Sequence, residues 1–170
     1  MSYSRSCGLW LRLGILTVLA THTATALAAP EVREVHKDWT VICEAGQDTG
    51  SNCIIVQQKN LKNTDQLALR IEVGHSPQNG QAIMIVTTPL GVSLPPGLSM
   101  QVDDHELLKF QYGSCMSAGC VVGTNLTDEM IETFRGGQQA NFTFLGGNGQ
   151  EITVPISLAG YTAAYRVVSQ

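Results

Sequence analysis

Residues 67–87 read LALRIEV, GHSPQNGQ and AIMIVT in succession, and this stretch decides the fold class. In residues 67–73, leucine, isoleucine and valine alternate with alanine, arginine and glutamate, which is the period of a strand with one buried face. Residues 74–81 combine glycine, proline, serine and asparagine, the residue types of turns. Residues 82–87 form a continuous apolar run of strand length, which predicts a strand buried on both faces. The stretch therefore predicts β-strands separated by a turn.

Most of the remaining chain repeats this pattern of short strands and turns. Further strands are predicted at 39–43, 53–59, 99–102, 107–112, 120–126, 140–145 and 151–157. Residues 89–97 contain three prolines and two glycines, which excludes a helix interior there. Residues 30–38 are polar and charged and predict a flexible lead-in. About eight strands separated by turns predict an all-β protein, an antiparallel β-sandwich.

Two short helices are predicted in the C-terminal third of the chain. Thr127 is a candidate N-cap, and the two acidic residues after it suit the positive end of a helix dipole. Gly136 and Gly137 would end this helix. Residues 158–168 also have helix-like spacing, with Ser157 as a candidate N-cap.

The first 28 residues have the organisation of a secretory signal. Arg5 and Arg12 precede a short apolar run at 13–20, and Ala26-Leu27-Ala28 matches the small-x-small signature of a cleavage site. An uncleaved membrane anchor is the alternative, but the apolar run is well below the ~18–20 residues that span a bilayer. We therefore expect cleavage after Ala28 and export of a single domain, residues 29–170, with no membrane span.

The charge balance excludes some classes of partner. The chain has 10 basic and 14 acidic residues, and loss of the two signal arginines changes the formal charge from −4 to −6. Proteins that bind nucleic acid usually carry a basic patch, so a nucleic-acid partner is not expected. An apolar share of 44% also excludes a disordered tail.

Four of the five cysteines lie beyond the signal: Cys43, Cys53, Cys115 and Cys120. An even count behind an export signal predicts two disulfides. The pairs Cys43–Cys53 and Cys115–Cys120 are favoured because each is close in sequence and flanks turn-forming residues. Loop entropy alone does not decide among the three possible pairings. A four-cysteine zinc site fits less well, because only the second pair has zinc-ligand spacing, and a redox Cys-x-x-Cys is absent.

No catalytic constellation is recognisable in the sequence. His36, His75 and His105 lie in a polar segment and two turns, without the spacing of a metal site. Residues 91–95 begin like a Gly-x-Ser-x-Gly elbow but end in proline. Residues 146–149 are glycine-rich but lack the Lys-Ser/Thr of a phosphate loop. We therefore expect no enzyme activity, no metal and no cofactor.

Four motifs in register resemble one known family. They are Trp39-x-Val41-x-Cys43 with Cys53-x-x-x-Gln57, Pro89-Leu90-Gly91-Val92-x-Leu94-x-x-Gly97, Cys115-x-x-x-Gly119-Cys120, and Ser157-Leu158-x-Gly160-Tyr161-x-Ala163-Ala164. In this order they resemble the invasion-associated locus B family of bacterial envelope proteins. The resemblance covers residues 39–164.

The resemblance implies an exported alphaproteobacterial protein with an immunoglobulin-like β-sandwich. Members were named for a role in host-cell entry, although others occur in free-living bacteria. The family has no established enzymatic activity, so no catalytic residue carries over. The four cysteines, the Pro/Gly loop and Trp39 as a core anchor do carry over. Tyr161 stands where phenylalanine is usual, and its hydroxyl would need a partner if buried.

The leading hypothesis is a non-catalytic exported protein in the periplasm, at the cell surface or secreted. It would bind a protein partner of the bacterial envelope or of the host-cell surface, with a role in invasion or envelope maintenance. Strand addition at an exposed sheet edge is one available mechanism, and Pro155 predicts that one edge is blunted. Two alternatives stay open: a periplasmic enzyme whose residues are scattered in sequence, and a metal-handling protein.

Overall fold

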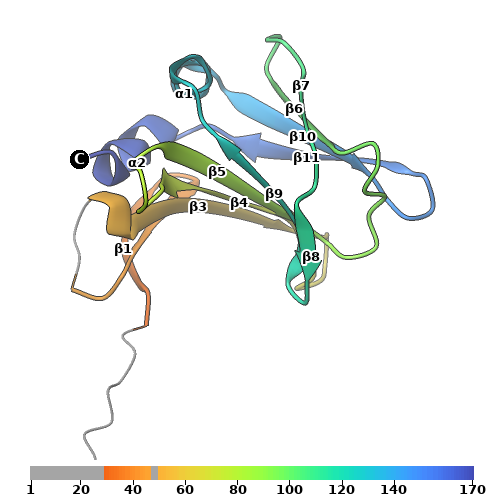
Figure 1. Cartoon of the computed structure of the whole chain (residues 1–170), viewed down its shortest axis with the longest axis horizontal. Coiled ribbons are helices and arrows are strands. Elements are labelled where there is room, and N and C mark those ends of the chain that lie inside the picture. The colour runs from red at the N-terminus through yellow and green to blue at the C-terminus, as the bar shows by residue number, and fades with distance from the viewer. Residues whose placement is uncertain (1–28, 47–49) are drawn as a thin grey trace, which may run out of the picture.

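The computed structural model describes residues 29–46 and 50–170, which form two antiparallel sheets (Figure 1). The larger sheet has seven described strands in the order β1-β2-β3-β4-β5-β9-β8, and the smaller has four in the order β11-β10-β6-β7. The strands are β1 (Glu31–His36), β2 (Trp39–Cys43), β3 (Cys53–Asn60), β4 (Leu67–His75), β5 (Ala82–Thr88), β6 (Leu98–Val102), β7 (Leu108–Phe110), β8 (Ser114–Met116), β9 (Gly119–Asn125), β10 (Gln139–Leu145) and β11 (Glu151–Ser157). The helices are η1 (Gly50–Asn52), α1 (Asp128–Gly136) and α2 (Tyr161–Val168). The predicted signal, 1–28, lies outside the described residues.

The predicted antiparallel sandwich with short helices is confirmed, but the strand count differs. The described residues contain eleven strands, where about eight were predicted. The flexible lead-in predicted at 30–38 is wrong, because residues 31–36 form β1 and pair with β2. The short strand β8 was also missed, and it pairs with β9 beside the second cysteine pair. In both segments, pairing with a neighbouring strand fixes a conformation that the local composition does not indicate.

The hydrophobic core lies between the inner faces of the two sheets. The alternation predicted for 67–73 is confirmed, since Leu69, Ile71 and Val73 are fully buried. The smaller sheet contributes buried aromatic and aliphatic residues from its own inner face, notably Phe142 and Ile156. Both α-helices lie on the same side of the larger sheet as the smaller sheet does, so they help to close this core (Figure 1).

The two helices differ in how they begin. Thr127 is the N-cap of α1 as predicted, because its Oγ1 accepts a hydrogen bond from the Met130 N–H at 3.2 Å. Ser157 was the wrong N-cap for α2, which begins after Gly160 at a φ of +92°. The backbone must turn sharply between β11 and α2, and glycine adopts this left-handed conformation without a Cβ penalty.

The start of the β11–α2 connection is held by two side chains from the larger sheet. Trp39 Nε1 and Gln57 Nε2 both donate to the Ser157 carbonyl oxygen, each at 2.9 Å. Gln57 Oε1 accepts from the Ser157 N–H at 3.1 Å. The buried amide of Gln57 is therefore satisfied by the backbone N–H and C=O of a single residue in the opposite layer, and this contact sets where α2 packs on the sheet.

Candidate interaction surface

The four cysteines in the described part of the chain lie at two hairpins of the larger sheet. Cys43 and Cys53 face each other across β2 and β3, with an S–S distance of 1.99 Å. Cys115 and Cys120 face each other across β8 and β9, with an S–S distance of 2.07 Å. Each disulfide therefore joins two strands of the same hairpin. The Cys43–Cys53 link is buried, whereas the Cys115–Cys120 link lies at the β8 end of the sheet, where Cys115 is exposed.

Peptide mapping under non-reducing conditions should find Cys43 linked to Cys53 and Cys115 linked to Cys120. Each pair occupies directly opposed positions of an antiparallel ladder, with Cα atoms 4.0 Å apart. The measurement is mass spectrometry of a digest prepared with and without reductant. A peptide joining either of the first two cysteines to either of the last two would contradict this pairing.

The outer face of the larger sheet, defined here as the side turned away from the core, carries two rows of mostly apolar residues. The backbone register aligns Val32, Ile42, Ile54, Gly74 and Ile83 in one row, and Val35, Thr40, Val56, Glu72 and Ile85 in the next. Val32 and Val35, at the β1 end of these rows, are 64% and 65% exposed. The charged pair of Arg70 and Glu72, 2.7 Å apart, interrupts the apolar surface near its middle.

The corresponding face of the smaller sheet is polar. Its register aligns Ser99, Thr143 and Thr153 in one row and places Gln101 beside Asn141 in the other. This is the usual arrangement for an antiparallel sheet with one face in water. The outer face of the larger sheet departs from that arrangement, because its apolar residues are exposed at Val32 and Val35 and partly exposed at the isoleucines of β2, β3 and β5.

The sheet edges also differ in their capacity to pair. The edge strand β11 carries Pro155, which has no N–H to donate, and this agrees with the predicted blunted edge. The edge strands β7 and β8 have three residues each. The remaining edge, β1, has six residues and a bulge between Val32 and Glu34. Among the described edge strands without proline, β1 is therefore the longest, so it is the edge best suited to strand addition.

The three histidines in the described part of the chain do not converge. His36 lies in β1, His75 ends β4, and His105 follows β6 in an exposed turn. Within residues 29–46 and 50–170, no three His, Cys, Asp or Glu side chains are grouped so that they could hold a metal ion. Among the described helices, none is long and apolar enough to cross a membrane.

The sequence matches one protein-family model over residues 39–169, and the family is described as Invasion associated locus B (IalB) protein. The chain belongs to the IalB family. The match includes all four motifs from which the resemblance was inferred, and it extends to the end of α2.

Curated and solved relatives agree with membership of the IalB family. Invasion protein B homologs from Brucella abortus strain 2308 and from biovar 1 strain 9-941 are each 26% identical over 166 residues, covering 96% of this chain and 95% of the relative. The crystal structure of invasion associated protein B from Bartonella henselae has a TM-score of 0.67 at 17% identity, covering 78% of this chain and 92% of that one. The structural likeness shows a shared fold.

Sequence reasoning missed the outer face of this IalB-family chain. The run at 82–87 was predicted to be buried on both faces, but only Met84 and Val86 of its apolar residues are fully buried, while Ile83 and Ile85 are partly exposed. Segment 30–38 was treated as polar, so the valines that extend the rows across β1 were not recognised. The sequence did contain a signal for an apolar outer face, because β-branched residues occupy the outward positions of β2, β3 and β5 as well as the inward ones.

Tyr161, whose hydroxyl was expected to need a partner if buried, is buried and leaves that hydroxyl unsatisfied among the described residues. The side chain is fully buried between Trp39, Phe134 and Tyr165, with ring centroids 5.2–5.5 Å away. The described residues provide no hydrogen-bond partner for its hydroxyl. Burial is the main cause that raises the pKa of the Tyr161 phenol above its ordinary value of 10.0, and Tyr165 contributes in the same direction.

We expect Tyr161→Phe to raise the free energy of unfolding at pH 7 by about 1 kcal/mol, because it removes a buried unpaired hydroxyl. Tyr112→Phe is the matched control. The Tyr112 hydroxyl has a partner in Thr88 Oγ1 at 3.2 Å, so the same change there should cost about 1 kcal/mol. Urea denaturation followed by circular dichroism measures both. A loss of stability in Tyr161→Phe would show that its hydroxyl is satisfied in solution.

The raised pKa of Tyr161 also predicts loss of stability in alkali. An unfolded tyrosine loses its proton near its ordinary pKa of 10.0, whereas the folded one still holds it. The unfolded state then binds fewer protons, so the free energy of unfolding should fall as pH rises above about 10. Burial raises the pKa of Tyr112 and Tyr165 in the same direction. Tyr161→Phe should make this decline shallower, as measured by urea denaturation between pH 8 and about 11.

Proposed function

We propose that this chain is an exported, non-catalytic IalB-family protein that binds a protein partner of the bacterial envelope or of the host-cell surface. The observation that carries the proposal is the apolar outer face of the larger sheet, which continues into the β1 edge. Two cysteine pairs at disulfide distance suit an oxidising compartment. The family description and the named relatives support a role associated with invasion.

The geometry suggests how a partner strand would dock. A strand added beside β1 would take main-chain hydrogen bonds from its free edge, and alternate side chains of that strand would lie on the outer face. There they would extend the rows that Val32 and Val35 begin. Backbone pairing would supply affinity for extended segments in general, and apolar residues at alternate positions would supply selectivity.

Photo-crosslinking in the source bacterium tests this binding mode. A photoreactive phenylalanine analogue is placed at Val35 or at Ile83 on the outer face, and at Thr153 on the polar face of the smaller sheet as control. We expect a discrete crosslinked protein at the first two positions and none at the third. Equal crosslinking at all three positions, or crosslinking at Thr153 alone, would place the binding surface elsewhere.

Cell fractionation tests the export part of the proposal. The protein should leave the cytoplasm and begin at Ala29, which an intact-mass measurement of the purified protein determines. Protease treatment of whole cells then separates surface exposure from protection inside the periplasm. A surface-exposed protein directs the partner search to host-cell proteins, and a protected one directs it to envelope proteins. A cytoplasmic protein with an intact N-terminus would contradict export.

A further inference from the structure

A cleft separate from the outer face lies between α1 and the β6–β7 hairpin, with a volume of about 370 Å³. Its floor is formed by Met100, Val102 and Phe134, which are all at least 97% buried. Leu108 and Met130, both partly exposed, form its sides. Such a volume falls within the range of small-molecule sites, and methionine side chains adapt to ligands of different shape.

The mouth of this cleft is acidic. Glu106 and Glu129 line it, both exposed, together with His105 and two threonines, and no lysine or arginine is among its lining residues. No described residue forms a hydrogen bond or ion pair with either of these two carboxylates. An apolar floor thus lies below two carboxylates that have no cationic partner in the described chain.

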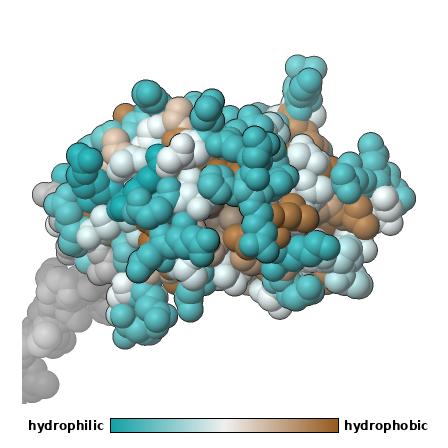
Figure 2. Space-filling model, turned by 90° about the horizontal axis from the view of Figure 1, so that it is seen from above, coloured by the Kyte–Doolittle hydropathy of each residue, from teal (hydrophilic) through white to brown (hydrophobic). Residues whose placement is uncertain are grey.

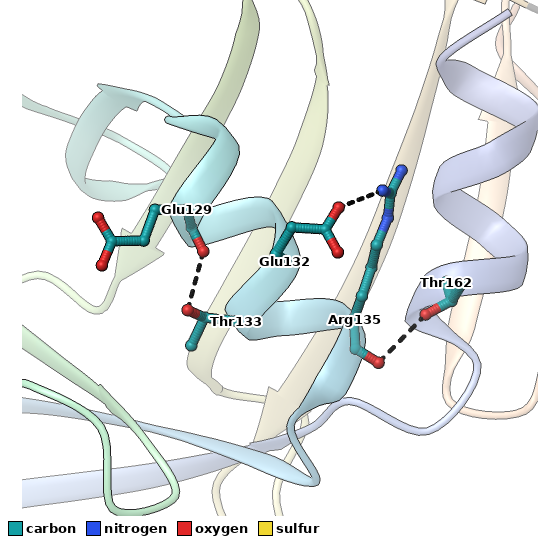
Figure 3. A network of polar contacts seen from close by, with 5 residues as sticks. All are labelled: Glu129, Glu132, Thr133, Arg135 and Thr162. Carbon is teal, nitrogen blue, oxygen red and sulfur yellow. Dashed lines mark hydrogen bonds and ion pairs between the residues drawn. The ribbon is translucent and has the colours of Figure 1, made fainter.

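The neighbouring glutamate on α1 is different. Glu132 forms an ion pair with Arg135 at 2.5 Å, on the side of α1 that faces α2. Figure 3 shows the Glu129 side chain pointing away from this pair. Figure 2, which looks onto the molecule from above, shows apolar surface lying between hydrophilic side chains on this side. Of these two glutamates, Glu132 is therefore paired and Glu129 is not, and Glu129 borders the cleft.

We propose that this cleft binds a small organic cation, an aliphatic or aromatic body that carries an ammonium group. The body would cover the methionine and phenylalanine floor and remove apolar surface from water. The ammonium group would remain at the mouth, where it donates charge-assisted hydrogen bonds to Glu106 and Glu129. An anion would be repelled there, and a neutral ligand would partly desolvate two carboxylates without pairing them.

Isothermal titration calorimetry of the purified exported protein with three ligands of equal chain length tests the charge preference. The ligands are n-octylammonium, octan-1-ol and n-octanoate. We expect saturable binding of one n-octylammonium per chain, roughly 10-fold tighter than octan-1-ol, and no saturable binding of octanoate. Binding of octanoate as tight as that of octylammonium, or no saturable binding of octylammonium, would overturn the proposal.

Single substitutions assign the binding to this cleft. Glu129→Gln and Glu106→Gln should each weaken octylammonium binding by roughly 3-fold or more and leave octan-1-ol binding unchanged. Glu132→Gln is the matched control on the same helix and should change neither affinity. Met130→Trp, which fills the cleft, should weaken the binding of both ligands. If the tryptophan variant loses its native circular dichroism spectrum, Thr133→Phe is used in its place. Equal effects of Glu129→Gln and Glu132→Gln would mean that the cation binds elsewhere.

Discussion

Replacing Trp39 with alanine is expected to lower the free energy of unfolding by about 3–5 kcal/mol, the usual cost of removing a buried tryptophan side chain. Trp39 is fully buried, packs edge-on against Tyr161 at 5.4 Å and donates to the Ser157 carbonyl. Its loss would leave a cavity where the larger sheet, the β11–α2 connection and α2 meet. Urea denaturation followed by far-ultraviolet circular dichroism measures the change.

Trp39→Phe separates packing from hydrogen bonding. This variant retains an aromatic ring beside Tyr161 but loses the indole N–H. The Ser157 carbonyl still accepts from Gln57 Nε2 at 2.9 Å, so it is not left unpaired. We therefore expect a loss of about 1–2 kcal/mol for phenylalanine, well below that for alanine. Similar losses for both variants would mean that the hydrogen bond outweighs the packing.

Gly160→Ala is expected to cost roughly 3 kcal/mol or more and to loosen β1. A Cβ at this position would lie 1.9 Å from the His36 carbonyl oxygen and 2.7 Å from the carbonyl carbon, so the backbone itself would have to move. The φ of +92° adds strain for any residue with a side chain. Urea denaturation gives the global loss, and hydrogen exchange of residues 31–36 reports whether the contact between β1 and α2 opens.

Gly80→Ala is the control for the contribution of φ alone. Gly80 has a φ of +68°, but a Cβ there would meet no atom within 4 Å. Its substitution should cost about 1 kcal/mol and leave hydrogen exchange in β1 unchanged. If both glycine variants lost the same stability, the close contact with His36 would contribute nothing to the loss in Gly160→Ala, and backbone strain alone would explain it.

Much of the fold could be predicted because its signals are local. Alternation in 67–73, the turn at 74–81 and the cap at Thr127 each depend on a few adjacent residues. The family motifs likewise indicated Trp39 as a core anchor, and the structure buries it completely. Ser157 was assigned the wrong role for a local reason as well, because a serine before a helical pattern resembles a cap, whereas its backbone is held by two side chains from another sheet.

The candidate surfaces could not be predicted in the same way. The strand β1 exists because β2 pairs with it, and whether Ile83 faces the core or the outside depends on what packs against each side of the sheet. The cleft brings together Glu106 and Glu129, which are on separate elements. Such features follow from contacts between residues far apart in the chain.

By itself, the sequence determined the fold class, the short helices, the cysteine pairs favoured for linkage and the family of this protein. Those properties depend on residue period, turn chemistry and motif order, which are all properties of the linear chain. Only the tertiary structure decided which sheet face is left apolar, which edge is open and where an acidic mouth meets an apolar floor. These depend on strand order and layer packing, which local sequence patterns do not specify.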